Sequence, residues 1–269
     1  MMENSAVHAD SWQALRRFTD ARIALGRAGH ALPTAAVMAF QLSHAQARDA
    51  VNQTVDFSGV ATGLSALGFG VHHLHSQAAD RPEFLKRPDL GRLLAEDAQR
   101  QLQAASSTLS GCEVVFVIGD GLSAWAVQRH AVPLLAETVA RLAGIRLCPT
   151  VFLAQQARVA LGDEVGAALQ SRLVVILIGE RPGLSSPDSL GVYLTYAPQR
   201  GRQNAERNCI SNVRPEGLGY AAAASALAGL IREALRLQLS GVGLKLEEKL
   251  LVAGAGNDLL PAGSIAEGV

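Results

Sequence analysis

The stretch LVVILIGERPGLSSPDSLGVYLTYAPQRGRQNAERNCISN, residues 173–212, decides the fold predicted for this chain. It begins with six consecutive apolar residues, 173–178, closed by Gly179. A short, β-branched run without polar alternation is typical of a strand buried on both faces. Glu180 and Arg181 follow at once, and ligands of open α/β sheets bind beyond the carboxyl ends of the strands. The charged pair therefore indicates either a ligand site or a surface turn with a local ion pair, and spacing leaves both open.

Strands and helices alternate on both sides of this stretch. Further strands are predicted at residues 114–118, 147–153 and 192–196. Helices are predicted at residues 123–130, 133–142, 162–170 and 218–237. Alternation at this spacing indicates an α/β fold with a Rossmann-like, mostly parallel sheet flanked by helices on both faces.

The chain before this alternating part is predicted to be a mainly helical N-terminal region, residues 1–107. Apolar spacing favours one helix over residues 10–25 and a second over residues 33–50. Asp89 is a good N-cap for a third helix over residues 90–106. Residues 108–245 then form the α/β domain, and residues 246–269 form an atypical C-terminal tail.

Composition limits the classes of partner. The chain has 269 residues, 49% of them hydrophobic, which is enough for a sizeable core. Lys plus Arg and Asp plus Glu number 24 each, so no net charge favours nucleic acid or anionic lipid. The longest uncharged stretch, residues 57–74, contains glycines and is no membrane span, and the N-terminus has no signal-peptide pattern. The sequence predicts a cytosolic protein that binds neither nucleic acid nor membrane.

Three candidate motifs carry little chemistry of their own. The turn at residues 119–123 lacks the GxGxxG, P-loop and nucleophile-elbow patterns, so it is either plain turn chemistry or a contact to a ligand or partner. His72, His73 and His75 would split between the two faces of a strand, which disfavours a metal site. Asp163 and Glu164 are adjacent, point apart and suit the start of a helix. The three cysteines form no CxxC pair. We therefore predict no metal site and no catalytic residue in this chain.

Several long blocks resemble the small (light) subunit of ethanolamine ammonia-lyase, an adenosylcobalamin-dependent enzyme. Besides GERPGLSSPDSLGVYLTYAP and AERNCISN, the matching blocks are TDARIALGRAG (19–29), RPDLGRLL (87–94), DGLSAWAVQRHA (120–131) and RVALGDEVG (158–166). The resemblance covers roughly residues 10–245 and stops before the tail. Blocks of this length in the same order are far more specific than one short pattern.

The resemblance implies a site and a cofactor. It implies that Val159, Glu180 and Cys209 contact adenosylcobalamin, which is shared with the large subunit of a hetero-oligomer. The substrate site is then expected in the large subunit, where ethanolamine is deaminated by a radical route to acetaldehyde and ammonia. Taken without the resemblance, Val159 fits a core position, Glu180 a partner of Arg181, and Cys209 a buried thiol.

Two further expectations concern location and class. The resemblance implies a cytoplasmic complex, with packaging in a bacterial microcompartment left open, because enteric members carry a longer N-terminal segment for packaging. The alternative reading is a free-standing α/β ligand-binding or scaffold protein that uses the turn at residues 120–123.

Overall fold

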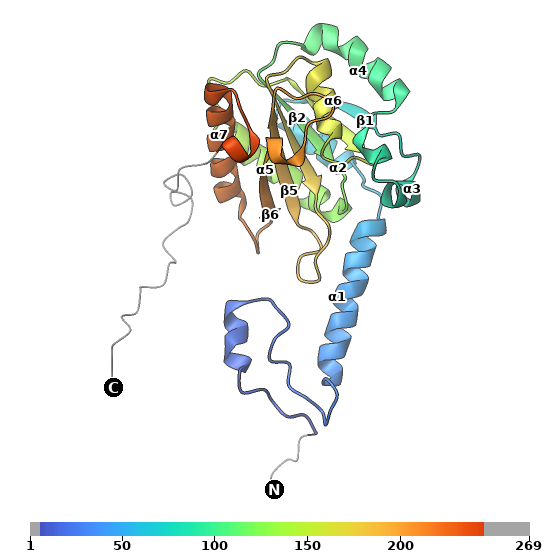
Figure 1. The fold of residues 1–269 in the computed structure, drawn as a ribbon, viewed down its shortest axis with the longest axis vertical. Helices are drawn as coiled ribbons and strands as arrows, with labels where there is room; N and C mark the ends of the chain where they lie inside the picture. The colour runs from blue at the N-terminus through green and yellow to red at the C-terminus, as the bar shows by residue number, and fades with distance from the viewer. Residues whose placement is uncertain (1–5, 245–269) are drawn as a thin grey trace, which may run out of the picture.

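A six-stranded mixed sheet forms the centre of the structure, a computed structural model that describes residues 6–244 (Figure 1). Its strands are β1 (Gly70–His75), β2 (Val114–Gly119), β3 (Thr150–Gln155), β4 (Leu173–Gly179), β5 (Leu190–Tyr196) and β6 (Arg207–Val213). The spatial order is β1-β3-β2-β4-β5-β6. Neighbours from β1 to β4 pair in parallel, and β5 runs antiparallel to both β4 and β6. The predicted mostly parallel sheet is confirmed, with β5 as the exception.

Helices surround the sheet and also extend away from it. They are α1 (Thr34–Asn52), α2 (Ser58–Ala66), α3 (Arg81–Lys86), α4 (Glu96–Leu109), α5 (Ala124–Val139), α6 (Leu161–Ala168) and α7 (Tyr220–Leu237). Short 3₁₀ helices lie at η1 (Gln13–Phe18), η2 (Leu90–Arg92), η3 (Asn204–Glu206) and η4 (Gly241–Gly243). None of the helices within residues 6–244 combines the length and apolar character needed to cross a lipid bilayer.

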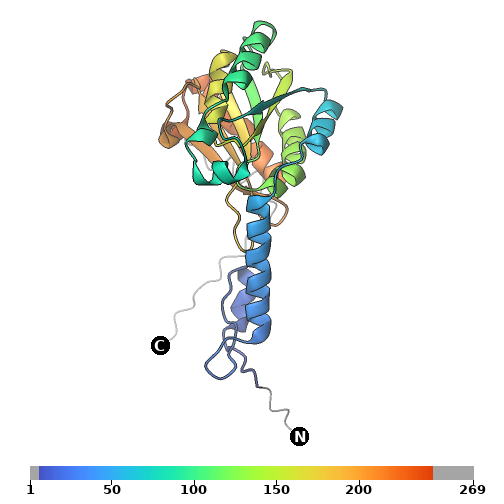
Figure 2. The same ribbon diagram turned by 90° about the vertical axis from the view of Figure 1, so that its right-hand side faces the viewer.

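Strand β4 lies between two hydrophobic cores, as its uninterrupted apolar run predicts. Alternate side chains enter opposite clusters: Leu173, Val175 and Leu177 join one, and Val174 and Ile176 join the other. The first cluster includes residues of α2, α5 and α7, and the second includes residues of α4 and α6. The sheet is therefore covered by helices on both faces, in three layers (Figure 2).

One continuous helix, α5, replaces two predicted helices. Pro133 lies inside it, although proline removes a backbone hydrogen bond and usually ends or kinks a helix. Ala131, Leu134 and Leu135 on either side of this proline are fully buried. Packing on both sides of Pro133 outweighs the local break that the sequence indicates.

The helix predicted to start after Asp89 starts at Glu96 instead. Asp89 does not cap it, and its carboxylate accepts two hydrogen bonds from the guanidinium of Arg87, at 2.9 and 2.6 Å. Between the 3₁₀ turn and α4 the backbone is extended, with Leu93 accepting from Gln77 and Ala95 donating to His75. These bonds to the chain just after and at the end of β1 hold the segment out of a helix.

Strands β1 and β6 were not predicted as strands. Both lie at sheet edges, where polar side chains such as His73 and Asn208 replace the apolar runs of the central strands. Strand β1 pairs with β3, so it joins the part predicted as N-terminal to the part predicted as α/β. Strand β3 begins three residues later than predicted, at Thr150. The division at residue 107 stays a prediction, and the tail, residues 246–269, lies outside the described residues.

An N-terminal arm, residues 6–52, projects from the sheet body (Figures 1 and 2). The helix predicted over residues 10–25 is wrong, because only the six-residue 3₁₀ helix η1 forms there and Ala24 and Gly26 have positive φ. Helix α1 follows, close to its predicted start at residue 33. The arm contacts the loop between β4 and β5: Arg22 donates to the Leu184 carbonyl at 3.3 Å.

Candidate functional site

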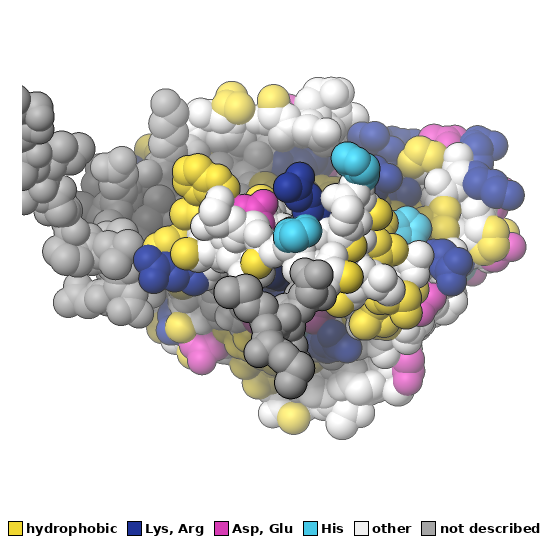
Figure 3. Space-filling model, turned by 90° about the horizontal axis from the view of Figure 1, so that it is seen from below, with side chains coloured by type: hydrophobic (Ala, Val, Ile, Leu, Met, Phe, Trp, Pro, Cys, Tyr) yellow, Lys and Arg dark blue, Asp and Glu magenta, His cyan; other side chains and the backbone are white. Residues whose placement is uncertain are grey.

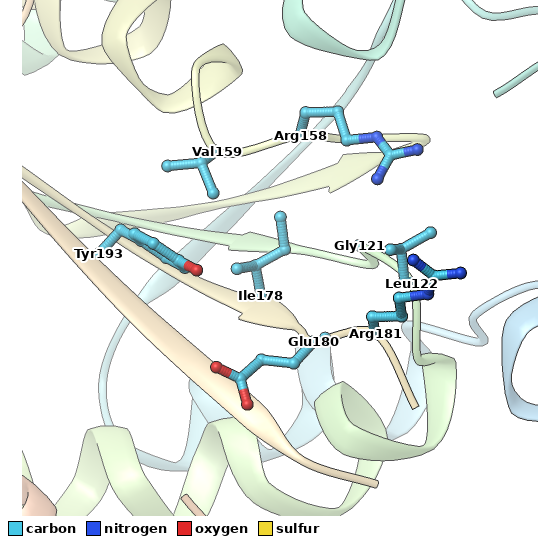
Figure 4. A pocket seen from close by; sticks show the side chains of 9 residues that line it. Gly121, Leu122, Arg158, Val159, Ile178, Glu180, Arg181 and Tyr193 are labelled. Carbon is cyan, nitrogen blue, oxygen red and sulfur yellow. The ribbon is translucent and has the colours of Figure 1, made fainter. Parts of the chain in front are cut away.

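A pocket of about 380 Å³ lies at the carboxyl ends of the central strands (Figure 4). Residues following β2 and β3, the end of β4 and one residue of β5 line it: Gly121, Leu122, Arg158, Val159, Ile178, Gly179, Glu180, Arg181 and Tyr193. Two of the three predicted site residues, Val159 and Glu180, are in the lining. Cys209 lies on β6 directly opposite the lining residue Tyr193. The structure thus brings together three residues that are up to 50 positions apart in sequence.

Glu180 is held by hydrogen bonds from two other strand ends. Its carboxylate accepts from the Ser189 hydroxyl, from the Ser211 hydroxyl at 2.6 Å and from the Asn212 backbone N–H at 3.2 Å. Its side chain extends toward β5, while Arg181 extends away beside Leu122 (Figure 4). The local ion pair between Glu180 and Arg181 is not formed. A carboxylate has about four acceptor positions, so Glu180 in the pocket lining keeps acceptor capacity beyond these three bonds.

Val159 forms part of a loop that separates two hollows. It lines the main pocket and a second one of about 250 Å³, which is also lined by Pro88, Arg92, Arg158, Ala160 and Asn204. Val159 is only half-buried, so the core role considered from sequence describes it incompletely. Its apolar side chain is available to a bound molecule.

Cys209 is exposed on the edge strand β6, and its thiol is free. Partial burial of the sulfur raises the pKa of this thiol, and the nearby Glu180 carboxylate raises it further, while a hydrogen bond with Tyr193 opposes both. Burial likewise raises the pKa of the Tyr193 phenol. Both groups are therefore neutral at physiological pH and offer close-packing and hydrogen-bonding contacts without charge.

The turn after β2 fixes the floor of the pocket. Gly121 has φ of +56°, and a Cβ there would lie 2.2 Å from the Gly179 carbonyl oxygen, so this position requires glycine. The Leu122 N–H donates to the same carbonyl at 2.8 Å. Ser123 caps α5 by accepting from the Ala126 N–H at 3.2 Å.

The polar groups of this turn are used within the chain. Asp120 pairs with the buried Arg81 at 3.2 Å and accepts from the Ala157 N–H at 2.8 Å. The Ser123 hydroxyl donates to the Pro187 carbonyl at 2.8 Å. Only Gly121 and Leu122 are left to line the pocket, which disfavours a free-standing ligand site built on the turn.

A second anchor holds the loop that follows Arg181. Asp188 accepts a hydrogen bond from Arg129 of α5 at 2.7 Å and lies 3.4 Å from His130 and 3.8 Å from Arg214. Burial by itself would raise the pKa of Asp188, but the contacts with Arg129 and His130 outweigh it and lower that pKa. The loop that carries the rim of the pocket is therefore tied to the helix layer.

Groups suited to acid–base or metal chemistry do not gather here. Within residues 6–244, no three His, Cys, Asp or Glu side chains are arranged to hold a metal ion. His72 packs against Phe152, and His75 hydrogen-bonds to Asp97 at 2.9 Å. Asp163 is not a solvated helix-start carboxylate, since it forms a buried two-pronged pair with Arg207, at 2.6 Å on each oxygen. The pocket offers binding and positioning groups.

The comparison with known proteins decides the family. The family model of the ethanolamine ammonia-lyase light chain (EutC) matches residues 9–245. This chain belongs to that family. The match spans the whole described sheet, its helices and nearly all of the arm.

Similar full-length proteins extend the light-chain match. The chain is 56% identical over 261 residues to the ethanolamine ammonia-lyase small subunit of Ralstonia nicotianae, covering 95% of this chain and 96% of that protein. It is 52% identical over 252 residues to the small subunit of Pseudomonas syringae pv. tomato, covering 93% and 88%. For the small subunit of Azotobacter vinelandii the identity is 51% over 271 residues, covering 98% and 100%. These relatives are subunits of a lyase.

Two residues that line the pocket, Tyr193 and Arg158, were not predicted from the sequence. Tyr193 lies in a strand whose apolar neighbours hide it, and Arg158 is one of many arginines in a chain of balanced charge. Arg158 directly precedes Val159, so its place in the RVALGDEVG block was the available signal. Tyr193 could be found only from the pairing of β5 with β6.

Proposed function

We propose that this chain is the small subunit of an adenosylcobalamin-dependent ethanolamine ammonia-lyase. In this proposal the assembled enzyme converts ethanolamine to acetaldehyde and ammonia, with the substrate site in the large subunit. Membership of the light chain family supports it. The observation that carries the proposal is that Val159 and Glu180 line one pocket at the carboxyl edge of the sheet, with Cys209 opposite the lining residue Tyr193.

The pocket suits one side of a corrinoid. Val159, Ile178 and Leu122 offer apolar surface, and Glu180 and Tyr193 offer polar groups. A corrinoid combines an apolar ring with amide side chains on its rim, so both kinds of surface have a use. Pockets that enclose small ligands measure about 300–1,000 Å³. A hollow of about 380 Å³ covers only part of so large a molecule, which supports a cofactor shared with the large subunit.

Each residue of the chain has a defined task in this proposal. The Glu180 carboxylate accepts hydrogen bonds from rim amides, and the serines that bind it keep it in place. Val159 packs against the cofactor, and Cys209 gives a small, soft contact beside Tyr193. When bound, the cofactor supplies the cobalt–carbon homolysis that starts the radical reaction. This chain binds and orients the cofactor and shields it from water on one side.

The surface of the arm is suited to an interface with a large partner protein. Several of its large apolar side chains are exposed, among them Trp12 (67%), Phe18 (63%), Met38 (60%) and Leu42 (60%). Viewed from below, hydrophobic side chains share the surface with Lys and Arg (Figure 3). Aromatic residues, Met and Arg are enriched in the cores of protein interfaces. We infer that the arm docks on the large subunit.

Two finer points belong to the same proposal. We regard the sheet and its two helical layers as Rossmann-like, because ligands of such sheets bind at the carboxyl edge, where the pocket lies. We also place the complex in the cytoplasm. Direct localisation of the complex in cells tests whether it is packaged in a microcompartment.

The test is activity with and without the partner. The purified chain with excess adenosylcobalamin should release no ammonia from ethanolamine, because it has no catalytic group of its own. Adding a large subunit of the same enzyme class should give ammonia and acetaldehyde. Ammonia release by the chain alone at the rate of the complex would overturn the proposal, as would an inactive mixture of both subunits.

A further inference from the structure

Three arginines and one carboxylate, Glu180, line the two pockets beside Val159. Arg158 and Arg181 line the main pocket, and Arg92 and Arg158 line the second one. Most arginines of the sheet body pair with a carboxylate, including Arg81, Arg129 and Arg207. Among the described residues, none of the three pocket arginines makes an ion pair.

Arg158 is held at the junction of the two pockets. Its backbone N–H donates to the Gly91 carbonyl at 2.7 Å, and its guanidinium carbon lies 4.3 Å from the centre of the Phe84 ring. One terminal nitrogen is 3.4 Å from the Phe84 carbonyl. The Nε is buried and has no hydrogen-bond partner within the described chain. A guanidinium fixed by stacking with an unused donor suits a planar or tetrahedral anion.

The carboxylate whose charge acts on Arg158 is already engaged elsewhere. Asp120 pairs with Arg81 at 3.2 Å and accepts from the Ala157 N–H at 2.8 Å. Burial and the neighbouring Arg81 and Arg92 lower the pKa of Arg158, while Asp120 opposes them. Asp120 binds Arg81, and Glu180 accepts hydrogen bonds from Ser189, Ser211 and Asn212. Neither carboxylate forms an ion pair with Arg158 or Arg92, so both guanidinium groups are open to an anion from outside the chain.

We propose that Arg158 and Arg92 form an anion site beside Val159 that binds the phosphodiester in the nucleotide loop of cobalamin. This inference rests on the proposed function, which brings a corrinoid to Val159. The phosphodiester is the permanent negative charge of that cofactor, and the corrin amides are neutral. The competing source of negative charge is a carboxylate of the large subunit.

The experiment compares two corrinoids on the assembled complex. Cobinamide keeps the corrin ring and its amides but lacks the nucleotide loop and its phosphodiester. Equilibrium dialysis with absorbance detection gives the affinity of each corrinoid for complexes carrying Arg158→Gln, Arg158→Lys or Arg92→Gln. Arg100→Gln is the matched control, because Arg100 is exposed on α4 and lines neither pocket.

We expect Arg158→Gln to weaken cobalamin binding roughly ten- to a hundredfold and to leave cobinamide binding unchanged. Arg158→Lys should recover part of the loss. The exposed Arg92 should give a smaller effect of about two- to fivefold, again on cobalamin alone. Arg100→Gln should change neither affinity.

Three results would overturn the anion site. Equal losses for both corrinoids would mean that Arg158 acts on the ring or on pocket shape, and no loss would mean no contact. Weaker subunit assembly at unchanged corrinoid affinity would assign the arginines to a carboxylate of the large subunit. If Arg158→Gln fails to fold, as its melting profile would reveal, the exposed Arg92→Gln decides alone. A wild-type complex that binds neither corrinoid would instead refute the proposed function.

Discussion

Glu180 and Arg181 are adjacent in sequence, but their side chains lie in different surroundings in the structure. The Glu180 carboxylate takes hydrogen bonds from Ser189 and Ser211, which lie 9 and 31 residues further along the chain. Arg181 extends away from it, on the other side of the strand end (Figure 4). Ser189 lies just before β5 and Ser211 lies on β6. Because the sheet already fixes these two strands, their hydroxyls orient the carboxylate with little further loss of conformational entropy.

At this scale we predict the effect of Glu180→Gln. The amide keeps one acceptor oxygen but loses the charge, so cobalamin affinity of the assembled complex should fall. A hydrogen bond to a charged group contributes about 1.5–3 kcal/mol, which corresponds to roughly ten- to a hundredfold, and glutamine should lie at the lower end. Glu96→Gln, on exposed α4, is the control. Unchanged affinity with a normal melting temperature would leave Glu180 with a purely local role.

Single residues were predictable where a motif, rather than a contact, identified them. The block resemblance named Val159, Glu180 and Cys209, and the structure brings all three together. Spacing alone left Glu180 open between a site and an ion pair. The buried pair of Asp163 with Arg207 joins residues 44 positions apart, and no local pattern indicates it. Long-range contacts of this kind depend on the order of the strands in the sheet, and no local sequence pattern reveals that order.

Edge elements differ from central ones in how they are held. Central strands such as β4 are stabilised by apolar side chains on both faces, and periodicity predicts them. Edge strands depend on specific polar contacts: Arg207 ties β6 to α6 through Asp163, and His75 ties the end of β1 to α4 through Asp97. This is why β1 and β6 escaped prediction, while β2, β4 and β5 were predicted within two residues.

The His75–Asp97 contact predicts a pH dependence of stability. Asp97 raises the pKa of His75 above its ordinary value of 6.5, and His75 lowers the pKa of Asp97. A base with a raised folded pKa stabilises the fold fully below its unfolded pKa, and the effect is lost as pH rises through the folded pKa. Because the pair is half exposed, the effect should be small.

The measurement is the melting temperature of the wild type and Asp97→Asn at pH 6 and pH 8.5. We expect the wild type to be the more stable protein at pH 6, with the difference fading at pH 8.5. His8→Gln is a control, since this histidine lies in the arm, where its backbone pairs with Arg27. An equal difference at both pH values would exclude a charged His75 as its source.

At the scale of the whole molecule, the arm contacts the loop that leads out of the pocket. Arg22 and Ser185 connect the arm to the β4–β5 loop, and that loop begins at the pocket residues Glu180 and Arg181. The arm has five arginines, three aspartates and no lysine or glutamate in residues 6–52. One partner with an apolar, acidic-rimmed surface can contact both. The sequence did not predict this arrangement, because an arm without a core of its own has no periodic signal of its direction.

Removing the apolar anchors of the arm should weaken assembly. In Trp12→Ala and Phe18→Ala the loss of a large exposed side chain should leave the fold of this chain intact, since neither is buried in it. Interface anchors contribute about 2 kcal/mol or more, so the dissociation constant for the large subunit should rise at least about thirtyfold for one of them. Leu237→Ala, an exposed leucine at the end of α7, is the control. Equal affinities for all variants would exclude the arm from the interface.

The most direct test of the account is cobalamin binding to three samples: this chain alone, the large subunit alone, and both together. In the proposed function the pocket of this chain covers only part of a corrinoid, so neither subunit alone should retain the cofactor through gel filtration. The mixture should elute as one complex with bound cobalamin. Tight cobalamin binding by the large subunit alone, unchanged when this chain is added, would contradict a shared cofactor site.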